Sequence, residues 1–147
     1  MSLNDRLTDD LKVAMRAKDA GRVSCLRMLK AAIKNEQVER GRELSDEEVQ
    51  GIISSLVRKG NEAIKEFREG GREDLAAKEE QELKIFYGYL PEQMTSEEVE
   101  NGLKDIINEL SASTMKDLGK VMKAAMARFA GRAQGKDINE IARKLLG

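Results

Sequence analysis

The chain has 147 residues, of which 40% are hydrophobic but only 3% aromatic, and it contains no Trp. Its core must therefore be built from Leu, Ile, Val, Ala and Met, a mixture that suits packing between helices better than packing between sheets. The 26 basic and 27 acidic residues leave a net charge of −1. This balance argues against wholesale binding of polyanions, although it does not exclude a local basic patch.

No apolar segment is long enough to span a bilayer, and the first residues lack the hydrophobic stretch of a secretory signal. The single cysteine, Cys25, has no second cysteine with which to form an internal disulfide. We therefore expect a cytoplasmic protein that does not associate with membranes.

The first part of the chain shows helical spacing of apolar residues almost throughout. One apolar stripe covers residues 3–15, and a second covers residues 23–33 after a break near Gly21. Residues 45–48, Ser-Asp-Glu-Glu, form a capping box that starts a third, long helix. A fourth helix is predicted over about residues 73–90.

The second part begins at Pro91, the only proline, because the residue before a proline disfavours the helical conformation. A second capping box at residues 95–98 starts the next helix. Thr114 is placed to cap a further helix, and Asp137 together with Glu140 to cap the last one. No segment alternates with a period of two residues, so no strand is predicted.

These patterns predict an all-α protein of two parts. Residues 1–90 are expected to form an N-terminal helical domain of about four helices, and residues 95–147 a small C-terminal three-helix domain. Because only a short segment around Pro91 joins the two domains, we expect their relative orientation to vary.

The residues that usually carry catalysis or bind metals are scarce. Histidine, the commonest general base and metal ligand, is absent. The acidic cluster of Glu79, Glu80 and Glu82 is more typical of a solvated helix face than of a Mg²⁺ site. Cys25 has no recognisable base nearby to activate it, which favours an inert thiol. The loop at residues 131–137 has its glycines one residue too close for a phosphate-binding loop. From all of these observations together we expect no catalytic residue, no cofactor site and no metal site.

A basic surface is the one candidate site in the sequence. Residues 116–147 hold eight basic residues and three acidic ones. With a helical period Lys116, Lys120 and Lys123 share one face, and Gly119 beside them would let a phosphate approach closely. This face is either an ordinary solvated surface or a small, phosphate-directed surface for polyanions. The full candidate set is Lys116, Gly119, Lys120, Lys123, Arg128, Arg132 and Lys136.

Four segments resemble the GatB/YqeY family. They are residues 26–36 (LRMLKAAIKNE), 89–94 (YLPEQM), 115–123 (MKDLGKVMK) and 135–141 (GKDINEI), and the resemblance covers essentially the whole chain. It implies a helical region and a small three-helix tail like the C-terminal part of the GatB protein of aspartyl/glutamyl-tRNA amidotransferase. It also implies a tail that contacts tRNA, and a family activity of a carbon–nitrogen ligase with glutamine as amido-N-donor.

The chain contains neither the catalytic domain of that amidotransferase nor its glutaminase, so the resemblance implies an accessory role. We expect a tRNA-associated protein of tRNA metabolism that is non-catalytic alone and binds tRNA through its basic tail. Its expected partners are tRNA and tRNA-charging or amidotransferase components. The alternative is a helical protein–protein interaction module with no RNA affinity. A third possibility, an autonomous amidotransferase, would release ammonia from glutamine.

Overall fold

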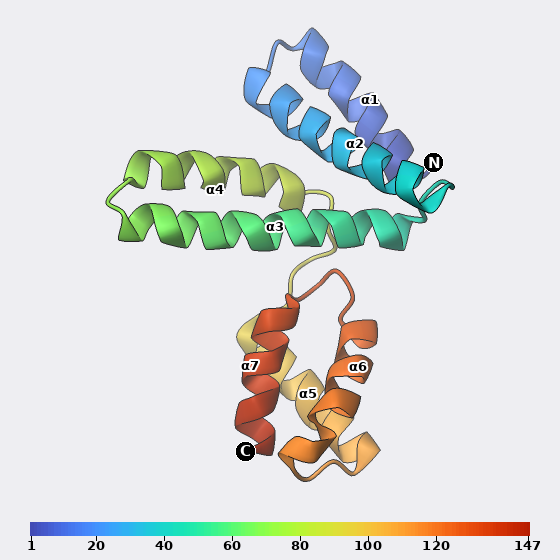
Figure 1. The fold of residues 1–147 in the computed structure, drawn as a ribbon, viewed down its shortest axis with the longest axis vertical. Helices are drawn as coiled ribbons and strands as arrows, with labels where there is room; N and C mark the ends of the chain where they lie inside the picture. Colours follow the sequence, from blue (N-terminus) through green and yellow to red (C-terminus); the bar gives the residue numbers. More distant parts are fainter. The chain divides into compact units, whose positions relative to one another are not determined.

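The computed structural model describes all residues, 1–147, and consists of helices without any strand (Figure 1). The expectation of an all-α protein is therefore confirmed. None of the helices is both long and apolar enough to cross a membrane. In chain order the elements are α1 (Leu3–Arg16), α2 (Ala20–Arg40), α3 (Asp46–Glu69), α4 (Glu73–Tyr87), α5 (Ser96–Leu110), the short 3-10 helix η1 (Met115–Asp117), α6 (Leu118–Arg128) and α7 (Gly135–Leu146).

The chain divides into two compact units, Met1–Leu90 and Pro91–Gly147, which we call the N-terminal unit and the C-terminal unit. The N-terminal unit contains two helical hairpins, one of α1 and α2 and one of α3 and α4 (Figure 1). In the C-terminal unit each of the helices α5, α6 and α7 contacts the other two. Each unit has its own hydrophobic core, built almost entirely from aliphatic side chains.

Local capping chemistry sets where several helices begin. Ser45 and Glu48 exchange side chain–backbone hydrogen bonds at the start of α3, and Thr95 and Glu98 do the same at the start of α5, as the sequence predicts. The Thr114 hydroxyl also caps, accepting from a backbone N–H. The element that it starts, however, is η1, which then leads into α6.

The break expected near Gly21 is present, since α1 ends at Arg16 and α2 begins at Ala20 with Asp19 as its N-cap. One predicted helix start is wrong in detail. α7 begins at Gly135, because Gln134, in an extended conformation, takes the N-cap position. Asp137 therefore lies in the first turn and does not cap the helix. Its carboxylate still stabilises the helix there through the positive end of the helix dipole.

The core of the C-terminal unit closes around a glycine. Gly102 lies in α5 against the ring of Phe129, a side chain that is only 4% exposed. A Cβ atom at residue 102 would lie 2.5 Å from Phe129 Cζ, closer than two carbon atoms can pack. The missing side chain is thus what lets the end of α6 approach α5 so closely.

Gly60 has the same role in the N-terminal unit. It is buried in the middle of α3, and a Cβ atom there would lie 2.4 Å from Leu83 Cδ2 on α4. The Leu83 side chain therefore occupies the space that a Cβ atom at residue 60 would need.

Tyr89 ties the segment after α4 to the first two helices of the N-terminal unit. Its side chain is 4% exposed, and its hydroxyl donates to Asp10 Oδ2 at 2.6 Å. The same hydroxyl accepts from Arg22 Nη2 at 3.3 Å, and the Arg6 guanidinium lies over the ring, 4.9 Å from its centre. This network fixes the end of the unit just before Pro91, where the second unit begins.

Cys25 lies on α2 in the core of the N-terminal unit and is 3% exposed. Burial, followed by the negative charges of Glu82 and Glu79, raises the pKa of its thiol to about 11. Because the thiolate is the reactive form, Cys25 is a poor nucleophile at neutral pH.

Replacing Gly102 by Ala should lower the free energy of unfolding by about 1–2 kcal/mol, since overpacking against a buried, rigid ring outweighs the better helix propensity of alanine. Gly119→Ala is the matched control, because no atom lies within 4 Å of a Cβ added there. It should leave the stability unchanged or raise it by up to about 1 kcal/mol. Urea unfolding followed by circular dichroism compares the two, and equal stabilities would contradict the close approach at Gly102.

Cys25 should resist alkylation in the native protein. At pH 8 we expect iodoacetamide to modify the folded chain at least about ten-fold more slowly than the urea-unfolded chain, because burial both blocks access and suppresses the thiolate. Mass spectrometry of the alkylated protein over time gives both rates. Equal rates would show that the thiol is not buried.

Candidate functional site

The side chains that could serve catalysis or metal binding are not gathered into a centre. No group of three or more His, Cys, Asp and Glu side chains is arranged to hold a metal ion. The acidic cluster on α4 is divided, because Glu80 forms an ion pair with Arg68. Glu79 is half-buried, and burial, together with the nearby charge of Glu82, raises its pKa. The remaining candidates are binding surfaces of the C-terminal unit.

The lysine surface, defined by Lys116, Gly119, Lys120 and Lys123, is open to solvent. Lys116 lies in η1, whereas the other two lysines lie in α6, and all three are exposed and without an ion pair. Gly119 is exposed as well, with open space where a Cβ atom would stand. A solvated helix face shows the same features, so this exposure by itself does not identify a ligand.

The three other predicted site residues differ in whether their charged groups are already paired within the unit. Arg128 forms a two-pronged contact with the Glu109 carboxylate, at 2.7 and 3.3 Å. Arg132 donates to the Glu92 carbonyl at 3.2 Å and lies 4.0 Å from a Glu98 carboxylate oxygen. Lys136 is exposed in the first turn of α7 and has no ion pair. Both arginines are thus engaged within the unit, and Lys136 alone of the three presents a free charge.

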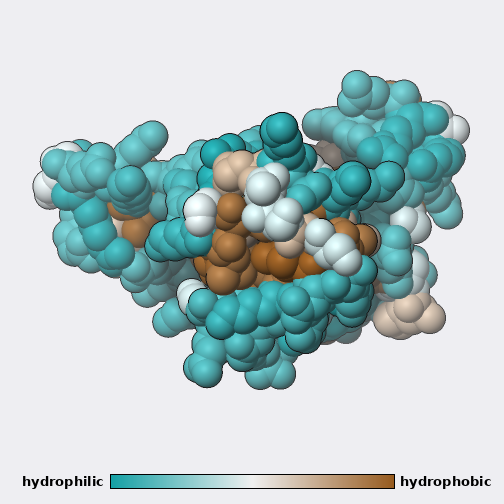
Figure 2. All heavy atoms as spheres, turned by 90° about the horizontal axis from the view of Figure 1, so that it is seen from below, coloured by the Kyte–Doolittle hydropathy of each residue, from teal (hydrophilic) through white to brown (hydrophobic).

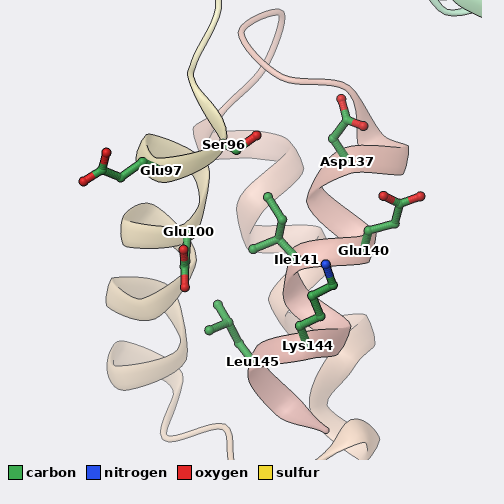
Figure 3. A pocket seen from close by; sticks show the side chains of 8 residues that line it. All are labelled: Ser96, Glu97, Glu100, Asp137, Glu140, Ile141, Lys144 and Leu145. Carbon is green, nitrogen blue, oxygen red and sulfur yellow. The ribbon is translucent and has the colours of Figure 1, made fainter.

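A groove of about 430 Å³ runs between α5 and α7 (Figure 3). Both helices begin at the same end of it, so that Ser96 and Asp137 lie near that end and Leu145 near the other (Figure 3). We call it the acidic groove. Its lining residues are Ser96, Glu97 and Glu100 from α5, and Asp137, Glu140, Ile141, Lys144 and Leu145 from α7.

The acidic groove has an apolar floor and a charged rim. Ile141 and Leu145 point from α7 toward α5, and both are half-buried. Glu97 on one side and Glu140 on the other point outward, away from the floor (Figure 3). Four of the lining residues are acidic and Lys144 is the only basic one. Such an arrangement can bury apolar side chains of a ligand while it attracts positive charge around them.

Sequence reasoning missed the acidic groove, although one signal for it was present. Residues 137, 140, 141, 144 and 145 follow the spacing of a single helical face, and this face carries both charged and apolar side chains. The matching residues of α5 gave no such signal, since only the packing of α5 beside α7 brings the two sets together.

A second apolar surface lies at the end of the C-terminal unit where α5 ends. Figure 2 shows there a hydrophobic area bordered by hydrophilic side chains. The exposed large hydrophobic side chains of this unit are Leu110 at the end of α5, Met115 at the start of η1 and Met126 in α6, which are 44%, 39% and 47% exposed. The acidic groove, whose lining residues and charges are defined, is the better candidate.

Several curated proteins are similar in sequence to the chain. Three of them, from Vanderwaltozyma polyspora, Pyrenophora tritici-repentis and Saccharomyces cerevisiae, bear the name "Altered inheritance of mitochondria protein 41, mitochondrial". They are 35%, 33% and 31% identical over 76%, 87% and 71% of this chain. The matches span 64%, 71% and 58% of those proteins, so the chain covers less than two thirds of the first and the third.

These names correct two expectations drawn from the sequence. They describe neither an amidotransferase nor a tRNA-binding protein, so the expected function, a tRNA-associated accessory protein of the amidotransferase type in tRNA metabolism, is wrong. The expected cytoplasmic location is contradicted as well, because the relatives are named as mitochondrial proteins.

The family assignment stands apart from these corrections. The sequence pattern of YqeY-like proteins matches residues 4–146, which is nearly the whole chain. All four segments that resemble the GatB/YqeY family lie within this match, and the resemblance is thereby confirmed. The chain belongs to the YqeY-like protein family.

Proposed function

We propose that the protein is a non-catalytic helical module that binds a partner protein through the acidic groove between α5 and α7. The observation that carries this proposal is the combination of an apolar floor, Ile141 and Leu145, with a charged rim. Partner side chains can lose water against the floor, which supplies affinity, while the rim selects for charge and orientation.

The relatives support a binding role indirectly. Their name refers to mitochondria and to the inheritance of mitochondria, and it names no chemical reaction. A module that acts by binding needs no activated nucleophile, general base or metal. The residues of this chain are therefore compatible with a binding role.

We further propose that the two units are separate domains, an N-terminal domain of four helices in residues 1–90 and a C-terminal three-helix domain in residues 95–147. The support is that each unit buries its own set of apolar side chains. Hydrogen exchange of the Gly102→Ala variant tests this, because the substitution should speed exchange in residues 95–147 alone. Faster exchange across α1–α4 as well would show that the two units unfold together.

A photo-crosslinking side chain at residue 96 tests the binding role directly. Ser96 is exposed and lines the groove, so a benzophenone amino acid placed there should capture the partner protein in an extract of the cells that naturally produce this chain. Mass spectrometry then identifies the captured protein and the peptide that is attached.

The same side chain at residue 101 is the matched control, since Asn101 is also exposed on α5 but does not line the groove. We expect the partner to be captured from position 96 and not from position 101. Capture of the same proteins from both positions, or of none from position 96, would refute binding in the acidic groove.

A further inference from the structure

We infer that the occupant of the acidic groove is a positively charged amphipathic helix of the partner protein, which lies along α5 and α7 as a fourth helix. This inference rests on the proposed protein-binding function and names the chemistry of the partner.

The charges of the rim call for a basic ligand. Glu97, Asp137 and Glu140 have no ion-pair partner within the chain, whereas Glu100 pairs with Lys104 at 3.6 Å. Three carboxylates are therefore free to pair with a ligand, and Lys144 is the only basic side chain among the residues that line the groove. Lys136, exposed beside Asp137 in the first turn of α7, lies outside the lining and reduces the negative charge at that end of the groove. A ligand with an excess of Lys or Arg gains from this field, and an acidic ligand is repelled by it.

The walls of the groove call for a helical ligand. An extended peptide is usually recognised by the open edge of a sheet, whose unpaired backbone groups it pairs with, and this chain has no strand. A groove between two helices instead accepts the side chains of a third helix. α7 has 12 residues and thus spans about 18 Å at 1.5 Å per residue, enough for three turns of a ligand helix.

Floor and rim together specify an amphipathic helix. Ile141 and Leu145 are four residues apart on α7, so they present one apolar stripe along the groove. A ligand with apolar residues at the i, i+3, i+4 and i+7 positions can pack one stripe against this floor. Lys or Arg beside that stripe would then reach Glu97 on the α5 side and Glu140 on the α7 side.

Fluorescence anisotropy of the full chain with designed helical peptides tests this inference. The probe is a labelled 14-residue peptide of Leu, Ala and Lys with its leucines along one helical face. We expect saturable, one-to-one binding that weakens as salt is raised, because the rim contacts are exposed to solvent. A peptide with Glu in place of every Lys should not bind, and one with the same composition in scrambled order should bind at least about five-fold more weakly.

Charge substitutions in the protein locate the site. The double variant Glu97→Gln/Glu140→Gln should weaken binding of the Lys peptide about five-fold at low salt, as expected for the loss of two solvent-exposed ion pairs. Glu92→Gln/Asp105→Asn removes two exposed acids of the same unit outside the groove and should change the affinity less than about two-fold. Circular dichroism should show that both variants keep their helices.

The outcomes separate this inference from the proposed function. Equal affinity of the two double variants, or equal binding of the acidic and the basic peptide, would overturn the inference. Self-association of the chain that the groove variant abolishes would overturn it too, since the occupant would then be a second copy. If no peptide binds while the crosslinker at residue 96 still captures a partner, the inference fails and the proposed function stands. If the capture also fails, both fall.

Discussion

The contact between Phe129 and α5 at Gly102 is the constraint on which the C-terminal unit depends. Because no side chain stands at Gly102, the ring lies directly against α5 and holds the end of α6 there. α7 packs against both helices, which leaves its face of Ile141 and Leu145 beside α5. The acidic groove therefore follows from the packing of helices and involves no loop, so its walls are built from rigid elements, as a binding site requires.

Much of the fold could be predicted from the sequence because the signals are local. The capping boxes that start α3 and α5 each join residues three apart, and a single sequence window contains both partners. Prediction failed where the local choice was weak. Gln134 is not a favoured N-cap residue, yet it starts α7 in place of Asp137. Likewise the sequence did not predict the 3-10 turn that precedes α6.

The candidate site was harder to predict for a physical reason. The lysine surface was predicted as the site because its clustered lysines are visible in the sequence. The acidic groove, in contrast, exists only once α5 and α7 are neighbours. Its acids also have a local explanation, because Glu97 and Asp137 lie in first turns, where carboxylates stabilise a helix in any case. The family resemblance was correct, but the function attached to it was not, since a shared family does not carry a function without the site that performs it.

Binding in the acidic groove is tested most directly by mapping the surface that a cationic amphipathic helix contacts. A two-dimensional ¹⁵N–¹H NMR titration of the full chain with such a peptide reports every backbone amide separately. Binding in the acidic groove predicts shifts concentrated in α5 and α7 along the groove, with the lysine surface and the whole N-terminal unit unchanged. Shifts centred on another surface, for example around the exposed side chains of Leu110 and Met115, would contradict such binding.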